Sequence, residues 1–306
     1  MDHGALYVPS RRNKLMVGSL IRKYLHIVGS GLGLIGVAFV ATRLMEYRDQ
    51  LPLSTLSVLA WFWVACLATG YGLCGAILAL AWRQILIFHG VRVTGLWSLR
   101  TYGTSQLAKY IPGNIFHLAS RQAIGVAAGM PAWPFAKSIG WELAVISATA
   151  LLFTPLAVPL QFPGLGPLAA ATMFVSILIL ALWLLRIFLS SHIASATAWY
   201  ATFLLLTGLI FSALLALTSG RHANMLLDPA MLVCVCGAYV LAWLAGLVTP
   251  GAPAGVGVRE AVLYWLLHGV TGHADLIAAI ILGRAVTVGG DLFFFVGATF
   301  ARSSHS

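Results

Sequence analysis

The sequence alternates long apolar runs with short polar segments. The apolar runs cover residues 24–40, 53–82, 133–160, 167–185, 194–218, 229–248 and 276–300. A helix needs about 20 mainly apolar residues to cross the hydrocarbon of a bilayer. The pattern therefore predicts an all-α membrane helix bundle of about 7–8 spans. We expect a single transmembrane domain over 24–300, preceded by a basic segment at 1–23 and followed by a short tail at 301–306.

Prolines and glycines interrupt this pattern between residues 249 and 260, directly after an apolar run. Proline lacks a backbone donor and glycine weakens a helix, so the segment is expected to be broken. Inside a bilayer, broken backbone is tolerated only where protein or a water-filled cavity satisfies it. Arg259 and Glu260 close the segment, and charges at such a place are expected to face inward or to lie at an interface.

A second interruption lies in residues 101–130, where polar side chains punctuate short apolar stretches. Arg121 follows Pro112 by nine residues, the same offset at which Arg259 follows Pro250. Paired interruptions in two halves of a chain are typical of transport sites, so the spacing suggests an internal repeat. The stretch predicts either a broken, re-entrant element that lines a cavity or an interfacial amphipathic helix followed by a loop.

Composition and charge narrow the class of protein. Of the 306 residues, 60% are hydrophobic and 8% are charged, against about 25% charged residues in soluble domains. The net charge is +10, and basic residues gather at 1–23 and 83–100. This bias predicts a cytoplasmic N-terminus and a cytoplasmic 83–100 loop, with contact to anionic headgroups rather than to nucleic acid. The four cysteines lie inside apolar runs and predict packing roles, so we expect no metal and no cofactor.

The faces from which the two interrupted segments enter depend on residues 101–130. If these residues do not cross the membrane, counting the later spans returns Pro250 to the cytoplasmic face, so both Pro-Gly segments enter from that face. If they cross fully, the two segments enter from opposite faces. The sequence leaves both arrangements open.

The two interrupted segments carry a family resemblance. The chain resembles the transmembrane module of the lysylphosphatidylglycerol synthase/flippase family, in its size, in its pattern of spans and in two motifs. These motifs are Thr249-Pro250-Gly251 with Gly255-x-Gly257-x-Arg259-Glu260, and Tyr110-Ile111-Pro112-Gly113-Asn114 with Arg121. The pair Pro253-Ala254 stands where a glycine-rich pair would be expected from the family.

The resemblance implies a function for the bundle. It implies an eight-span-like bundle with broken helices and a cavity, in a bacterial-type inner membrane, that moves a lipid headgroup between leaflets. A polyprenyl phosphate or polyprenyl phosphosugar is the preferred substrate class, ahead of an anionic phospholipid. The chain ends at Ser306 without the aminoacyl-transferase domain of the two-domain members. No lysyl transfer to lipid is therefore expected.

A phosphate-bearing lipid suggests which charged residues bind it. The planar guanidinium of arginine pairs with phosphate through two hydrogen bonds. We expect Arg259 and Arg121 to hold the phosphate, and the other substrate-binding candidates are Lys109, Asn114, Glu142, Gly255, Gly257, Glu260, Arg284 and Asp291. The alternative for Arg259 and Glu260 is a structural pair at the start of a helix.

The candidates differ in their expected roles. Gly255 and Gly257 would let backbone amides approach the phosphate, at the positive end of a helix that starts near residue 258. Glu142 is expected to neutralise an arginine, because buried charges are usually paired. Arg284 and Asp291, seven residues apart, fall on nearly one face of the last span, so each is the other's nearest partner in sequence.

Catalysis is not expected, because the eight acids are scattered and form none of the usual acid–base or nucleophile arrangements. The alternative function is a non-catalytic scaffold or regulator of a glycosyltransferase or lipid-modifying enzyme. Its partners would be that enzyme or a second copy of the chain. Charges at broken helices favour transport, because a scaffold gains nothing from their cost.

Overall fold

The computed structural model describes residues 57–111, 115–162, 164–219, 228–249 and 253–301. Every element within these residues is helical. Six helices are long and apolar enough to cross a membrane, and they occupy the predicted runs: α2 (Val58–Phe88), α5 (Ala132–Leu151) continued by α6 (Thr154–Gln161), α7 (Pro167–Phe188), α8 (Ser191–Thr218), α10 (Pro229–Val248) and α12 (His273–Phe300). The predicted all-α architecture is confirmed for the described residues, and six long apolar helices indicate an integral membrane protein. The basic segment 1–23 and the first predicted span, 24–40, lie outside the described residues.

The predicted span 133–160 is divided into two helices. α5 ends at Leu151 and α6 begins at Thr154, with Pro155 in its first turn. The ring of a proline clashes with the carbonyl four residues earlier, which here belongs to Leu151, and proline donates no hydrogen bond. The chain therefore breaks its helical ladder where the sequence predicted one continuous helix.

Five shorter helical elements, together with the long helix α10, form two hairpins. The first consists of α3 (Gly95–Gln106), the 3₁₀ turn η1 (Leu107–Tyr110) and α4 (Phe116–Ala127). The second consists of α10, the 3₁₀ turn η3 (Pro253–Gly255) and α11 (Val258–Leu267). Ile111 and Thr249 each precede a proline and are extended, with ψ of 133° and 114°. A residue before proline avoids the helical region of φ and ψ. The first helical segment of each hairpin therefore ends at the residue before its proline.

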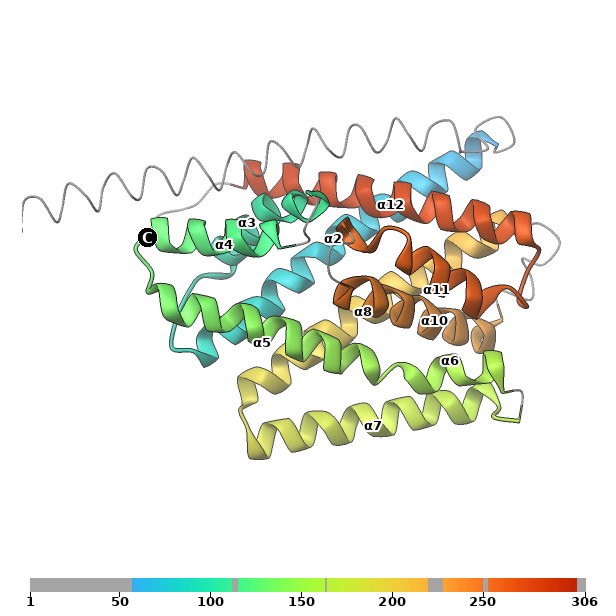
Figure 1. Ribbon diagram of the computed structural model, residues 1–306, viewed down its shortest axis with the longest axis horizontal. Helices are drawn as coiled ribbons and strands as arrows, with labels where there is room; N and C mark the ends of the chain where they lie inside the picture. Colours follow the sequence, from blue (N-terminus) through green and yellow to red (C-terminus); the bar gives the residue numbers. More distant parts are fainter. Residues whose placement is uncertain (1–56, 112–114, 163, 220–227, 250–252, 302–306) are drawn as a thin grey trace, which may run out of the picture.

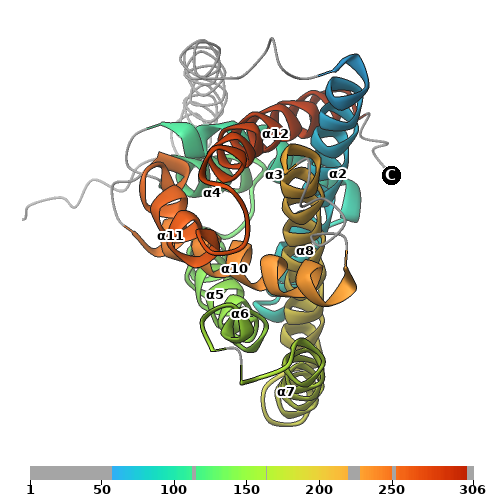
Figure 2. The same cartoon turned by 90° about the vertical axis from the view of Figure 1, so that its right-hand side faces the viewer.

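The two hairpins extend toward one another from opposite ends of the bundle (Figure 1). The end that carries the loops 89–94, 128–131 and 189–190 is called here the basic end. The α3–α4 hairpin starts from it, whereas the α10–α11 hairpin starts from the opposite end, which faces the viewer in Figure 2. Their tips meet inside the bundle, where η1 contacts η3. Within the described residues, α10 stops short of the basic end and α11 turns back, so the two hairpins approach one another from opposite ends of the bundle (Figure 1).

Close helix packing holds the middle of the bundle together. α2 packs against α8 and α12, and a Cβ added to Gly72 of α2 would lie 2.6 Å from the carbonyl oxygen of Gly290 on α12. The two backbones can approach this closely only because both residues lack a side chain, as at small-residue contacts between membrane helices. α7 lies at the periphery and exposes most of its surface (Figure 2).

Candidate functional site

The hairpin tips, α2, α5, α8, α10 and α12 surround a cavity of about 100 Å³, called here the central cavity. Five of the predicted binding residues line it: Lys109, Arg121, Glu142, Arg259 and Arg284. They come from η1, α4, α5, α11 and α12, so the fold gathers residues that are up to 175 positions apart in sequence (284 minus 109). Asn114 lies outside the described residues.

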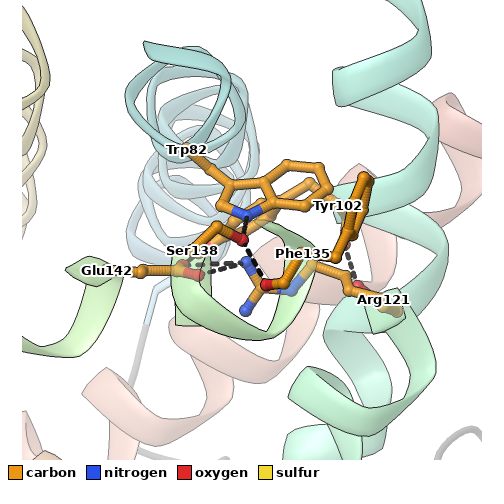
Figure 3. A network of polar contacts seen from close by, with 7 residues as sticks. Trp82, Tyr102, Arg121, Phe135, Ser138 and Glu142 are labelled. Atoms are coloured by element: carbon orange, nitrogen blue, oxygen red, sulfur yellow. Dashed lines mark hydrogen bonds and ion pairs between the residues drawn. The ribbon is translucent and has the colours of Figure 1, made fainter. Parts of the chain in front are cut away.

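Arg121 and Glu142 form a buried ion pair between α4 and α5 (Figure 3). Nη1 of Arg121 donates to both carboxylate oxygens of Glu142 at 2.8 Å, and the hydroxyl of Tyr102 donates to Oε1 at 2.9 Å. The guanidinium lies 4.1 Å from the centre of the Tyr102 ring and 5.4 Å from the Trp82 ring, as in cation–π contacts. Glu142 thus neutralises Arg121. Nε of Arg121 is buried without a hydrogen-bond partner among the described residues.

Asp291 of α12 ties down the tip of the first hairpin. Its carboxylate is 2.7 Å from Nζ of Lys109, and it accepts hydrogen bonds from the Tyr110 hydroxyl and, at 3.3 Å, from Nε2 of Gln106. Asp291 is 3% exposed, so a single carboxylate serves three partners on α3 and η1. These contacts hold η1 against α12, and Lys109 is neutralised there.

Arg284, two turns earlier on α12, ties down the second hairpin. Its Nε pairs with Oε1 of Glu260, and its Nη1 donates to the carbonyl of Ala254 at 2.9 Å. Nη2 is buried without a partner in the described part of the chain. Arg284 and Asp291 are both buried on α12, as expected, but they do not pair. Seven residues separate them by about 10 Å along the axis, so each bonds a different hairpin.

Arg259 differs from the other three cations. It is 8% exposed, lines the central cavity, and lies over the ring of Tyr239 at 4.5 Å. Within the described ranges no carboxylate lies within 4.0 Å of its nitrogens. The expected alternative, a pair with the adjacent Glu260, is not formed, because Glu260 bonds Arg284. The cations of this cluster therefore outnumber its acids by one, and the surplus charge is on Arg259.

The glycines of the second motif have structural partners. A Cβ added to Gly255 would lie 2.8 Å from Cα of Gly246, so the two backbones pack directly against one another. Gly257 has φ of 88°, a conformation that favours glycine. Its amide donates to Oε2 of Glu260 at 2.6 Å. α11 begins at Val258, close to the predicted position, but the Gly257 amide expected to approach a phosphate is occupied by the protein's own carboxylate.

Sequence reasoning assigned no binding role to several other residues of the cavity. His117 lines it, and its Nδ1 is buried without a partner among the described residues. Tyr71, Tyr102 and Tyr110 also line the cavity. The sequence does contain a signal for these tyrosines. A buried hydroxyl needs a hydrogen-bond partner, so a tyrosine inside an apolar run indicates a polar group nearby.

The described residues contain no group of three or more His, Cys, Asp or Glu side chains that could hold a metal ion. The central cavity instead combines paired charges, neutral polar groups and one cation without an acid. Such a site is suited to hold an anion by electrostatics and hydrogen bonds. No family model, curated protein or solved structure matches the chain. The resemblance to the flippase module therefore stays a prediction.

Proposed function

We propose that the protein is a lipid translocator that moves a phosphate-bearing lipid between the leaflets of a membrane. The observation that carries the proposal is Arg259, a buried cation without an acidic partner among the described residues, on the wall of a cavity inside a membrane bundle. An unpaired buried charge costs several kcal/mol unless it meets a counter-ion. A phosphate supplies that counter-charge and suits the planar guanidinium.

Buried donors without partners add to this argument. Nε of Arg121 and Nη2 of Arg284, both from residues that line the cavity, have no acceptor in the described part of the chain. Each buried donor left without an acceptor costs about 1–3 kcal/mol. A phosphate brings several acceptor oxygens and would offset that cost. In this proposal Arg259 is the primary phosphate ligand, with Arg121 and Arg284 as secondary ligands.

The arrangement of the hairpins supports transport. In this proposal both hairpins are re-entrant, entering the bilayer from opposite sides without crossing it. α2, the first hairpin and α5–α6 then form one unit, and α8, the second hairpin and α12 form another unit of inverted direction (Figure 1). Inverted repeats with interrupted helices meeting at mid-membrane are typical of secondary transporters. A scaffold would have no need of such a site.

The charge of the bundle ends supports one orientation. Arg92 lies in the loop at the basic end, and Arg186 lies in the last turn of α7, which ends there (Figure 1). Because cytoplasmic loops carry an excess of Lys and Arg, we place this end in the cytoplasm of a bacterial-type inner membrane. The N-terminus is expected on the same side.

The test is transport in reconstituted vesicles. The protein is placed in phosphatidylcholine vesicles with NBD-labelled phosphatidylglycerol or NBD-labelled polyprenyl phosphate, and dithionite quenching reports which label reaches the outer leaflet. Arg259→Gln should slow transport about ten- to a hundredfold, because a hydrogen bond to a charged group contributes about 1.5–3 kcal/mol. Arg186→Gln, the same change at an exposed arginine outside the cavity, should leave the rate unchanged.

Native mass spectrometry of the same proteins tests binding. The parent should retain a phosphate-bearing lipid that Arg259→Gln loses. A folded Arg259→Gln protein that moves both lipids at the parental rate would refute the proposal. Equal retention of bulk lipid by both proteins, without transport, would favour the scaffold and a search for a partner enzyme.

A further inference from the structure

The lining of the central cavity is partly charged and partly apolar. Its cations come from the hairpin tips, α4, α11 and α12, as described above. Its apolar lining includes Leu118 of α4, Leu143 and Ile146 of α5, and Trp243 and Leu247 of α10. A site for a small water-soluble anion has no need of an aliphatic wall. An amphipathic ligand matches both parts of the lining.

The apolar part of the lining reaches the surface of the bundle. Leu143 lines the cavity and is 37% exposed, and Trp243 and Leu247 are partly exposed. The charged residues Arg121, Glu142 and Arg259, in contrast, are each less than 9% exposed. The apolar wall of the cavity is therefore exposed at α5 and α10, and these three charges are buried behind it, whereas Lys109 on η1 is partly exposed.

The exposed apolar wall lies about a third of the way along the α5–α6 span, counted from its start at Ala132. Leu143 is eleven residues after Ala132 in the α5–α6 span, about 16 Å from its start on a helix rising 1.5 Å per residue. Leu247 is next to the last residue of α10, beside the hairpin tip. A hydrocarbon core is about 30 Å thick, so a wall at this depth faces lipid tails rather than water.

We infer that the exposed apolar wall on α5 and α10 is a lateral portal for a lipid whose tails remain in the bilayer while its phosphate occupies the central cavity at Arg259. The inference rests on the proposed function and narrows its substrate. A cavity of about 100 Å³ is well below the roughly 300–1,000 Å³ of pockets that enclose drug-sized ligands. It accommodates a phosphate and a few waters. The substrate is therefore a lipid with a small phosphate headgroup, such as a polyprenyl monophosphate, rather than a lipid-linked oligosaccharide.

The portal is tested by narrowing it. Leu143→Trp puts a larger side chain on the exposed apolar wall, and Leu151→Trp makes the same change at a 57% exposed position of α5 that does not line the cavity. In the vesicle assay, Leu143→Trp should slow the NBD-labelled polyprenyl phosphate at least tenfold, whereas Leu151→Trp should stay within twofold of the parent. Size-exclusion chromatography confirms that each variant is folded.

Cross-linking locates the tails independently of the rate. A polyprenyl phosphate with a photoreactive group on its chain should label α5 and α10 around Leu143 and Leu247 in the parent, and this labelling should be lost in Arg259→Gln. Labelling around Leu143 and Leu247 no stronger than around Leu151 would overturn the portal.

The outcomes separate the portal from the proposed function. If Leu143→Trp moves lipid at the parental rate while Arg259→Gln does not, the portal is wrong and the translocator stands. If the parent moves neither NBD lipid, the proposed function fails and the portal fails with it. Comparing the transport rates of NBD-labelled phosphatidylglycerol and NBD-labelled polyprenyl phosphate distinguishes a glycerophospholipid substrate from a polyprenyl phosphate. Equal transport of a lipid-linked oligosaccharide would refute the restriction to small headgroups.

Discussion

The buried pair Arg121–Glu142 allows a quantitative prediction of stability. Glu142→Gln keeps the shape of the side chain and removes its charge. Arg121 is 2% exposed and Glu142 is 4% exposed, so the remaining guanidinium has almost no access to water. Breaking a buried ion pair from one side costs about 3–5 kcal/mol. Arg121 keeps its contact with the Tyr102 ring at 4.1 Å, so we expect a value near the lower limit, about 3 kcal/mol.

The assay is thermal unfolding of the purified protein in detergent, followed by intrinsic fluorescence at a fixed heating rate. In domains of 150–250 residues, 1 kcal/mol corresponds to about 2–4 °C. The chain is somewhat longer, so Glu142→Gln should lower the midpoint by about 6 °C. The double variant Arg121→Met with Glu142→Leu should recover most of this loss, because replacing a buried pair by apolar side chains is often neutral or stabilising.

Two results would refute this reasoning. A midpoint for Glu142→Gln within 1 °C of the parent would mean that Arg121 gains another counter-charge or access to water. A double variant less stable than both single variants would mean that the pair contributes more than its charges cost. In either case the charge count that makes Arg259 the surplus cation would have to be revised.

Two further predictions concern a close glycine contact between two helices and a strained alanine, and both are checked by the same unfolding assay. Gly72→Ala should lower the midpoint, because its Cβ would lie 2.6 Å from the Gly290 carbonyl and must push α2 from α12, at a cost of about 1–3 kcal/mol. Gly70→Ala on the same helix meets only the end of Ile210 at 3.8 Å and should be neutral or stabilising by up to about 1 kcal/mol; equal effects of both would contradict the packing argument. Ala254→Gly should raise the midpoint, because Ala254 has φ of 48°. A left-handed alanine costs about 1–2 kcal/mol, and after the entropy cost of glycine is subtracted the expected gain in unfolding free energy is about 0.5–1 kcal/mol. A lower midpoint would show that no strain is relieved.

The spans could be predicted because length and hydropathy decide them locally. Residues 229–248 were predicted as a run, and α10 has these bounds. The break after Leu151 was missed although Pro155 was visible, because hydropathy averaged over a window hides a single residue without a backbone donor. Interruptions of the helical pattern were predicted at the two Pro-Gly segments, where the effect of a proline on the preceding residue is again local.

The partners of the charged residues could not be predicted from spacing. Sequence distance makes Asp291 the nearest acid to Arg284 within the last span, but Asp291 bonds Lys109, 182 positions earlier (291 minus 109). Arg284 bonds Glu260. These pairs depend on where the hairpin tips meet α12, which is a property of tertiary packing. The tyrosine contacts could not be predicted for the same reason, because the hydroxyls of Tyr102 and Tyr110 donate to carboxylates on helices later in the chain.

The pairing decides which arginine an incoming anion would engage first. From the sequence, Arg259 and Arg121 were expected to hold the phosphate together, because spacing does not show which arginine already has an acidic partner. In the fold, Arg121 and Arg284 already bond carboxylates, and withdrawing either from its partner would leave a buried charge that costs about 3–5 kcal/mol. Arg259 holds no acid among the described residues, so a phosphate that approaches it breaks no ion pair. The ion pairs Lys109–Asp291, Arg121–Glu142 and Arg284–Glu260 then continue to hold the hairpins against α5 and α12. Arg259 is free to bind the phosphate. On this argument, substituting Arg259 impairs binding with little effect on folding, whereas substituting Arg121 or Arg284 affects stability first.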